Sequence, residues 1–141
     1  MTRMCVVAIF LLSSFTGARA DDFRAYDVEI IYPWTRATAP GQSDGAVFMK
    51  LSNTGDYADR LLRASSPMAG HVQVRPGRTI DIAPGETVTL APGGAYVALG
   101  GLAAPLVEGT TVPLTLTFER GGTVDVAVTV AGPDAAAPPS E

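Results

Sequence analysis

The side chains of this sequence that could do metal chemistry are few. The chain has one histidine, His71, and beyond residue 20 it has two methionines, Met49 and Met68. Imidazole nitrogen and thioether sulfur together suit the soft ion Cu(I). One imidazole makes no metal site without partners, so His71 with Met68 is a weak candidate site, and an ordinary surface histidine is the alternative. Met49 alternates with Val47 and Leu51, and we expect it to pack in the core.

Other side chains could bind an anion or a protein. Arg75, Arg78 and Tyr96 are of the types that contact oxyanions and protein partners, and a solvated rim without function is the alternative. Trp34, Arg36 and Arg78 form a candidate partner surface, because tryptophan and arginine often anchor protein contacts. Trp34 could instead be an aromatic plug at one end of the fold, with a partner for its indole N–H.

No arrangement of catalytic residues is recognisable in the sequence. The only cysteine, Cys5, lies in the N-terminal apolar segment, and Ser65-Ser66 matches no nucleophile elbow. A single histidine without a serine motif does not predict a triad. Gly93-Gly94 and Gly100-Gly101 are typical of turns between strands rather than of phosphate loops. We therefore expect a protein that is not an enzyme.

The elements that must position these side chains are predicted to be β-strands. Apolar and polar residues alternate over 112–118 and again over 124–130, and Arg120-Gly121-Gly122 between them predicts a hairpin. Pro113 should lie at a strand start or on an edge. Many short strands predict an all-β sandwich or barrel. Further strands are predicted at 27–32, 45–53, 59–65, 70–75, 78–82, 86–91 and 95–100.

The strand predicted at 70–75 has one polar and one apolar face. Successive side chains of a strand point to opposite sides, so Val72 and Val74 should face the core. His71, Gln73 and Arg75 should then share the opposite face. This places His71 on the more polar face of the strand.

The length of 141 residues predicts one domain preceded by an export signal. Arg3, a short apolar run and Ala18-Arg19-Ala20 predict a signal peptide over 1–20, cleaved near Ala20. The run is too short to span a bilayer, and an uncleaved anchor is the alternative. The domain then covers 21–131, with 21–26 leading into the first strand. Residues 132–141 lack an apolar pattern and are predicted to be a disordered tail.

Charge and cysteine content narrow the class of protein. Removing residues 1–20 takes away two arginines and no acid, so the net charge falls from −4 to −6. An acidic chain is a poor partner for nucleic acid, whose phosphates need basic patches. The mature chain would hold no thiol, although a periplasmic location permits disulfides. We expect a soluble periplasmic protein that does not insert into the membrane after cleavage.

Ordered sequence blocks from about Val28 to Val130 resemble those of the periplasmic copper chaperones called PCu(A)C. The resemblance implies a single cupredoxin-like Greek-key β-sandwich. It also implies a role in carrying Cu(I) towards cytochrome oxidase assembly. The blocks are Pro33-Trp34-Thr35-Arg36-Ala37, Leu51-Ser52-Asn53-Thr54-Gly55-Asp56, Ala64-Ser65-Ser66-Pro67, Leu90-Ala91-Pro92-Gly93-Gly94 and Val112-Pro113-Leu114-Thr115-Leu116-Thr117-Phe118.

The family's copper site uses two histidines and two methionines, and the resemblance assigns three of those positions to Arg75, Tyr96 and Ala98. A hairpin that carries a methionine in the family is shortened here to 76–79. Arginine is a permanent cation, the tyrosine oxygen is a hard donor, and alanine has no donor atom. We therefore expect no cofactor, and copper only if the family inference overrides the missing ligands.

Three hypotheses for the function remain. In the first, the chain is a non-enzymatic accessory or binding module that works beside other periplasmic copper-handling or oxidase assembly proteins. In the second, it is a genuine Cu(I) carrier with a relocated site around His71 and Met68. In the third, it is a structural interaction protein unrelated to copper. The number of soft donors favours the first and third.

Overall fold

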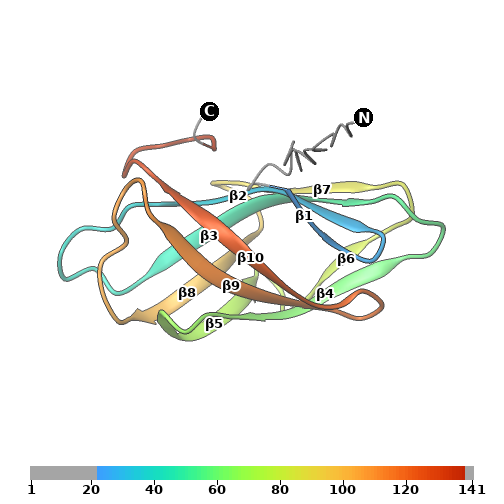
Figure 1. Cartoon of the computed structure of the whole chain (residues 1–141), viewed down its shortest axis with the longest axis horizontal. Coiled ribbons are helices and arrows are strands. Elements are labelled where there is room, and N and C mark those ends of the chain that lie inside the picture. Colours follow the sequence, from blue (N-terminus) through green and yellow to red (C-terminus); the bar gives the residue numbers. More distant parts are fainter. Residues whose placement is uncertain (1–21, 139–141) are drawn as a thin grey trace, which may run out of the picture.

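The computed structural model describes residues 22–138, and their regular structure is β-strand alone. The predicted signal peptide lies outside the described residues, as do residues 139–141 of the predicted tail. The strands are β1 (Asp22–Ala25), β2 (Val28–Arg36), β3 (Gly45–Asn53), β4 (Asp59–Ser65), β5 (Ala69–Arg75), β6 (Ile80–Ile82), β7 (Thr87–Leu90), β8 (Tyr96–Leu102), β9 (Thr111–Phe118) and β10 (Gly122–Ala131) (Figure 1).

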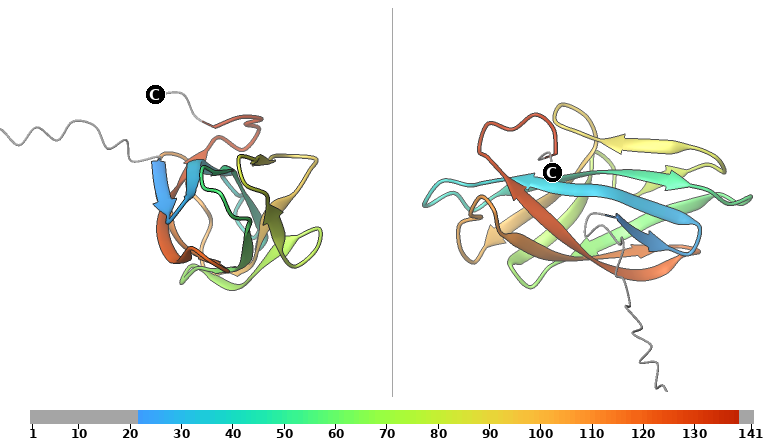
Figure 2. Two further views of the ribbon diagram at one scale, coloured as in Figure 1. Left: turned by 90° about the vertical axis from the view of Figure 1, so that its right-hand side faces the viewer. Right: turned by 45° about the horizontal axis from the view of Figure 1, so that its top comes forward.

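These strands form one sheet that curls around a core. The hydrogen-bonded order is β5-β8-β3-β2-β10-β9-β4-β6, with β1 added to β2 and β7 added to β3. Seen end-on, the strands form a ring (Figure 2). Because β4 and β5 are not neighbours in the hydrogen-bonded order, the described sheet has a seam between them. The predicted all-β sandwich or barrel is confirmed.

Two central strands change partners along their length. The first half of β2 pairs with β1, and its last residues run parallel to the end of β10. Likewise, β3 pairs with β7 over Met49–Ser52 and with β8 over Gly45–Val47. The expectation that residues 21–26 only lead into the first strand was wrong for Asp22–Ala25, because a two-residue turn at Tyr26-Asp27 folds them back as β1. Tyr26 has φ +57°, a conformation that two-residue hairpin turns require.

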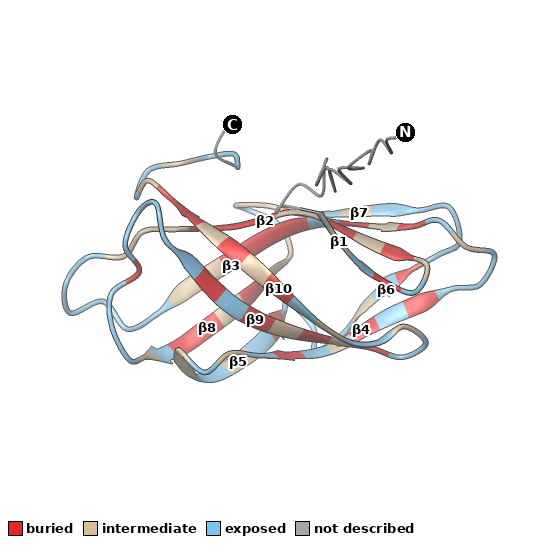
Figure 3. Cartoon of the chain, viewed as in Figure 1, coloured by how far each residue is buried: buried red, intermediate tan, exposed pale blue. Residues whose placement is uncertain are grey.

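The core is filled by alternate side chains of the strands. Val112, Leu114, Leu116 and Phe118 of β9 are all buried, while their neighbours in the strand are more exposed, as predicted (Figure 3). Met49 is 2% exposed, which confirms the prediction that it packs in the core.

Within residues 22–138 no helix is long and apolar enough to cross a membrane.

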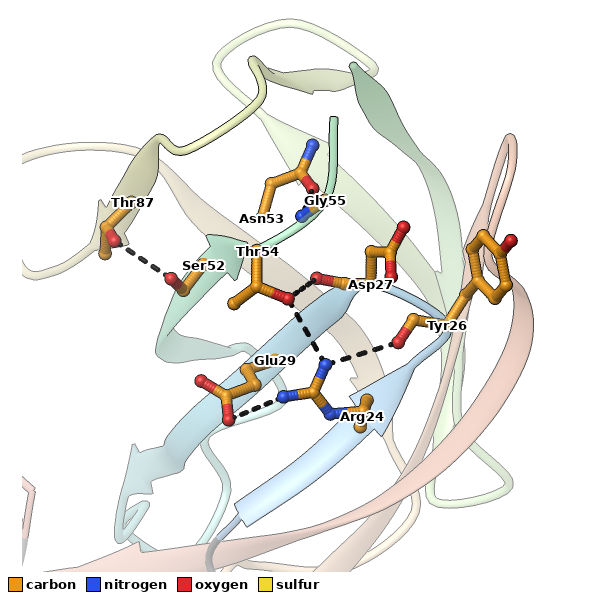
Figure 4. Close-up of polar contacts among 9 residues, drawn as sticks. All are labelled: Arg24, Tyr26, Asp27, Glu29, Ser52, Asn53, Thr54, Gly55 and Thr87. Atoms are coloured by element: carbon orange, nitrogen blue, oxygen red, sulfur yellow. Dashed lines mark hydrogen bonds and ion pairs between the residues drawn. The ribbon is translucent and has the colours of Figure 1, made fainter. Parts of the chain in front are cut away.

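Polar contacts tie the N-terminal hairpin to the β3–β4 loop (Figure 4). The Arg24 guanidinium donates to Glu29 at 2.9 Å and to the Thr54 hydroxyl at 3.3 Å. The Thr54 hydroxyl in turn donates to the Asp27 carbonyl at 2.9 Å. Asn53, which is 1% exposed, donates to the carbonyls of Tyr57 and Ile82. The loops at this end are therefore fixed by side chain to backbone contacts.

Candidate functional site

The outer face of β5 and β8 gathers most of the residues that the sequence singled out. In the antiparallel register of these strands, His71 lies opposite Gly100, Gln73 opposite Ala98, and Arg75 opposite Tyr96. Side chains at directly opposed positions share one face of the sheet. His71, Gln73 and Arg75 are exposed while Val74 is 3% exposed, which confirms the predicted alternation of this strand.

These residues line a shallow hollow of about 230 Å³. Arg75, Tyr96 and Ala98, the three positions that the resemblance assigned to copper ligands, lie in it together with His71. A Cβ atom on Gly100 would overlap the His71 imidazole, so glycine at this position lets the ring lie flat on β8. The tertiary structure therefore brings His71 into one hollow with the three positions that the resemblance assigns to copper ligands.

The donors in this hollow are hard, apart from one imidazole. Besides His71 and the Tyr96 phenol, the hollow contains the exposed Asp44. Met68 is half-buried, packs against the main core and does not line the hollow. Among residues 22–138, no three histidine, cysteine, aspartate or glutamate side chains are grouped as a metal ion would require. The arrangement offers a cation and hydrogen-bonding groups to a ligand.

Trp34 lies outside the main core, on the outer face of the sheet. A register shift between Ile31 and Trp34, where Tyr32 has φ +47°, brings Thr35 to the inside and leaves Trp34 opposite Phe48. The two rings lie 4.8 Å apart between centroids and are tilted by 47°. Trp34 is only 3% exposed, because Ala131 and other side chains of this outer cluster cover it. Within residues 22–138 no hydrogen bond of its indole N–H is present.

The C-terminal segment folds back onto this outer cluster. The Arg36 Nε donates to the Ala135 carbonyl at 2.7 Å, and Ala135 packs against the cluster. Tyr96 also packs there, so the outer cluster adjoins the hollow on β5 and β8. The sequence predicts disorder from residue 132. The contacts of Ala135 hold this part of the segment at the sheet, and disorder of the tail stays a prediction.

The three residues proposed as a partner surface come from two different parts of the fold. Trp34 and Arg36 are neighbours on β2, whereas Arg78 lies in the β5–β6 turn. Arg78 instead lines a second hollow with Arg75 and with Arg63 of β4. Sequence reasoning missed Arg63 and Asp44. Strict alternation from the buried Leu61 would place Arg63 inside, and the register shift between Leu61 and Arg63 in the pairing of β4 with β9 turns it outward. Neither this shift nor the neighbours of Arg63 can be predicted from local sequence.

The residues matched by a protein-family model are 28–130. This model describes the LpqE-like family ("Putative lipoprotein LpqE-like"). A search among curated proteins found no match.

Several solved structures share the fold. The copper-bound PCuAC domain from PmoF2 is 30% identical, with a TM-score of 0.76, and the match covers 79% of this chain and 98% of that one. The apo PCuAC domain from PmoF1 is 28% identical, with a TM-score of 0.77 and coverages of 79% and 99%. The solution structure of Cu(I)-DR1885 from Deinococcus radiodurans is 32% identical, with a TM-score of 0.58 and coverages of 70% and 74%.

The family model spans most of the chain, and the PmoF2 domain aligns over nearly its whole length. The chain belongs to the LpqE-like family and has the fold of its PCuAC domains.

Proposed function

We propose that this chain is an extracytoplasmic, non-enzymatic binding module of copper handling that lacks the family's own Cu(I) site. The observation that carries the proposal is the hollow on β5 and β8. There Arg75, Tyr96 and Ala98 lie beside the only histidine of the chain. The match to a lipoprotein family supports a location outside the cytoplasm. The copper-bound relatives support a place in copper handling.

The chemistry of this hollow opposes Cu(I). A soft monovalent cation prefers thioether and imidazole donors, and the hollow supplies one imidazole. The Arg75 guanidinium lies across the strand pair from Tyr96, so a bound cation would meet a positive charge that does not deprotonate. A relocated carrier site would need Met68 beside His71, but Met68 packs against the core and is not part of the hollow.

The accessory role also needs a surface for a partner. Arg36 and Tyr96 are partly exposed at the outer cluster next to the hollow, where Arg36 also lies over the buried Phe48 ring. Tyrosine and arginine side chains are common anchors of protein contacts. We propose that this region contacts another periplasmic copper-handling or oxidase assembly protein.

The test is a titration of the protein with Cu(I) against a competing chelator. We expect an affinity no higher than that of a peptide with one histidine, and at most a small further loss in a His71→Ala variant. Tight binding that disappears in His71→Ala would overturn the proposal and favour the relocated carrier site.

A variant designed to gain Cu(I) binding also tests whether the family's copper site has been lost. The triple change Arg75→His, Tyr96→His and Ala98→Met removes the cation. It places three suitable donors on the face that β5 and β8 share. We expect the Cu(I) affinity to rise at least tenfold, which corresponds to about 1.4 kcal/mol. The matched control is Thr87→His on β7, an exposed position that does not line the hollow. Equal affinities of the triple and control variants would show that these positions do not form a latent site.

A further inference from the structure

A second hollow collects three arginines from separate segments of the chain. Arg63 comes from β4, Arg75 from the end of β5, and Arg78 from the turn that follows. The hollow has a volume of about 360 Å³ and also includes Leu62, Val72 and Gln73. Its residues come from β4, from β5 and from the turn after β5, at the seam where the sheet is not closed by hydrogen bonds. We call it the arginine hollow.

The cations of the arginine hollow differ from the other arginines of the described chain. Arg24 pairs with Glu29, Arg60 pairs with Asp81 at 2.6 Å, and Arg36 donates to a carbonyl. Arg120 has no ion pair among residues 22–138, but its guanidinium stacks over the Tyr57 ring at 4.6 Å from the centroid. The hydrogen bond that Arg60 donates to Asp81, together with the negative charge of Asp81, raises the pKa of Arg60. Within residues 22–138, Arg63, Arg75 and Arg78 have no ion pair and no side-chain hydrogen bond.

The lining of the arginine hollow has no negative charge to offset these three cations. No aspartate or glutamate of the described chain lines it. This is notable in a chain with 14 acidic and 10 basic residues, where an acidic neighbour for each cation would be easy to supply. Three like charges around one space repel one another, and an anion placed between them removes that repulsion. The arrangement therefore points to a negatively charged ligand.

The residue types define the class of that ligand. The guanidinium group presents a planar fork of N–H donors that matches carboxylate and phosphate oxygens. Gln73 adds an amide, and the half-buried Leu62 and Val72 add apolar wall. The volume lies near the lower limit of pockets for small molecules. We propose that the arginine hollow binds a small multivalent oxyanion through carboxylate or phosphate groups.

The arginine hollow can be tested independently of the proposed loss of the copper site. Gln73 and Arg75 line both hollows, while Arg63 and Arg78 line only the arginine hollow. Variants of Arg63 and Arg78 therefore report on the oxyanion alone. The outcome of the Cu(I) titration has no bearing on this test.

The test is calorimetric titration of the protein with citrate, with inorganic phosphate and with acetate. The titrations are made at low ionic strength, because salt screens exposed charges. We expect citrate or phosphate to bind one to one with a dissociation constant below about 1 mM, and monovalent acetate to bind at least about tenfold more weakly. The tighter of the two multivalent ions identifies the ligand as a carboxylate or a phosphate.

Variants show whether binding occurs in the arginine hollow. Arg63→Gln and Arg78→Gln should each weaken binding about tenfold or more, since each removes charge-assisted hydrogen bonds. Arg78→Lys should recover only part of the loss, because it keeps the charge and loses the fork. The matched control is Lys50→Gln, which removes one exposed positive charge of β3 outside the hollow and should leave binding unchanged.

Two results would overturn the proposal. One is the absence of binding for both multivalent ions in a protein that is folded by circular dichroism. The other is an equal loss of affinity in Lys50→Gln and the arginine variants, which would mean a general attraction of anions. Arg63→Gln and Arg78→Gln are exposed substitutions, so an unchanged unfolding midpoint verifies that each variant is folded.

Discussion

Polar groups have opposite environments in two regions of the barrel, its loop end and the seam between β4 and β5. The loop end comprises the turns at 26–27, 53–58 and 119–121. There the buried Asp59 carboxylate accepts hydrogen bonds from the backbone N–H groups of Arg60, Arg120 and Gly121, at 2.8, 2.7 and 3.0 Å. Near the seam, Arg63, Arg75 and Arg78 are exposed and have no such partners among residues 22–138.

This difference separates polar groups that hold the fold from polar groups that are free to bind. A buried polar group must be hydrogen-bonded, because leaving it unpaired costs free energy of folding. Exposed side chains without partners contribute little to stability and can exchange water for a ligand. The loop end therefore stabilises the barrel, and the two hollows along β5 are the places to look for function.

The largest expected effect is at the loop end. Asp59→Ala would remove the carboxylate and leave the N–H groups of Arg120 and Gly121 without an acceptor. We expect the free energy of unfolding to fall by about 2–4 kcal/mol, measured by urea denaturation. The control Asp56→Ala changes an exposed acid of the neighbouring loop and should cost less than about 0.5 kcal/mol. Similar losses in both variants would contradict the structural role of Asp59.

A smaller effect is expected in the hollow on β5 and β8. Gly100→Ala would place a Cβ atom where the His71 imidazole lies, and the ring would swing away because it is the free end of a side chain. The free energy of unfolding should change by less than about 1 kcal/mol, since alanine is better than glycine in a strand. The NMR signals of the His71 ring should shift clearly. The control is Gly94→Ala, whose Cβ meets no side chain within 4 Å. Unchanged His71 signals in Gly100→Ala would show that the ring does not lie on β8.

The smallest effect on stability is expected for the arginine hollow. Arg63→Gln, Arg75→Gln and Arg78→Gln each remove an exposed cation that has no ion pair among residues 22–138. We expect the unfolding free energy to stay within about 0.5 kcal/mol of the parent value. Adding citrate should raise the melting temperature of the parent more than that of Arg78→Gln, since a ligand that binds only the folded state stabilises it by an amount that grows with its affinity. A large loss of stability without ligand would mean that these arginines hold the fold.

Much of the fold could be predicted because strand patterns are local. The alternation of Val112, Leu114, Leu116 and Phe118 predicted both the strand and its buried face. The same rule placed His71 and Arg75 on one exposed face of β5. Turn residues bounded the strands to within a few positions.

The features that the sequence did not predict lie where local signals are weak. Tyr26 adopts φ +57° in a two-residue turn without being glycine, so β1 gave no hairpin signal. The register shift at Tyr32 moved Trp34 to the outer face, and such a shift leaves no trace in composition. The contact between Arg36 and Ala135 joins residues that are 99 positions apart.

The sequence by itself determined that this is an all-β chain with one histidine, few thioethers and an acidic net charge. These properties depend on residue types and on short-range alternation. Only the tertiary structure decided which side chains meet. Strands β5 and β8 are separated by two other strands along the chain, and their pairing joins His71 and Arg75 to Tyr96 and Ala98. The approach of β4 to β5 adds Arg63 to Arg75 and Arg78. Neighbours of this kind follow from long-range strand order, which the packing of the whole core selects.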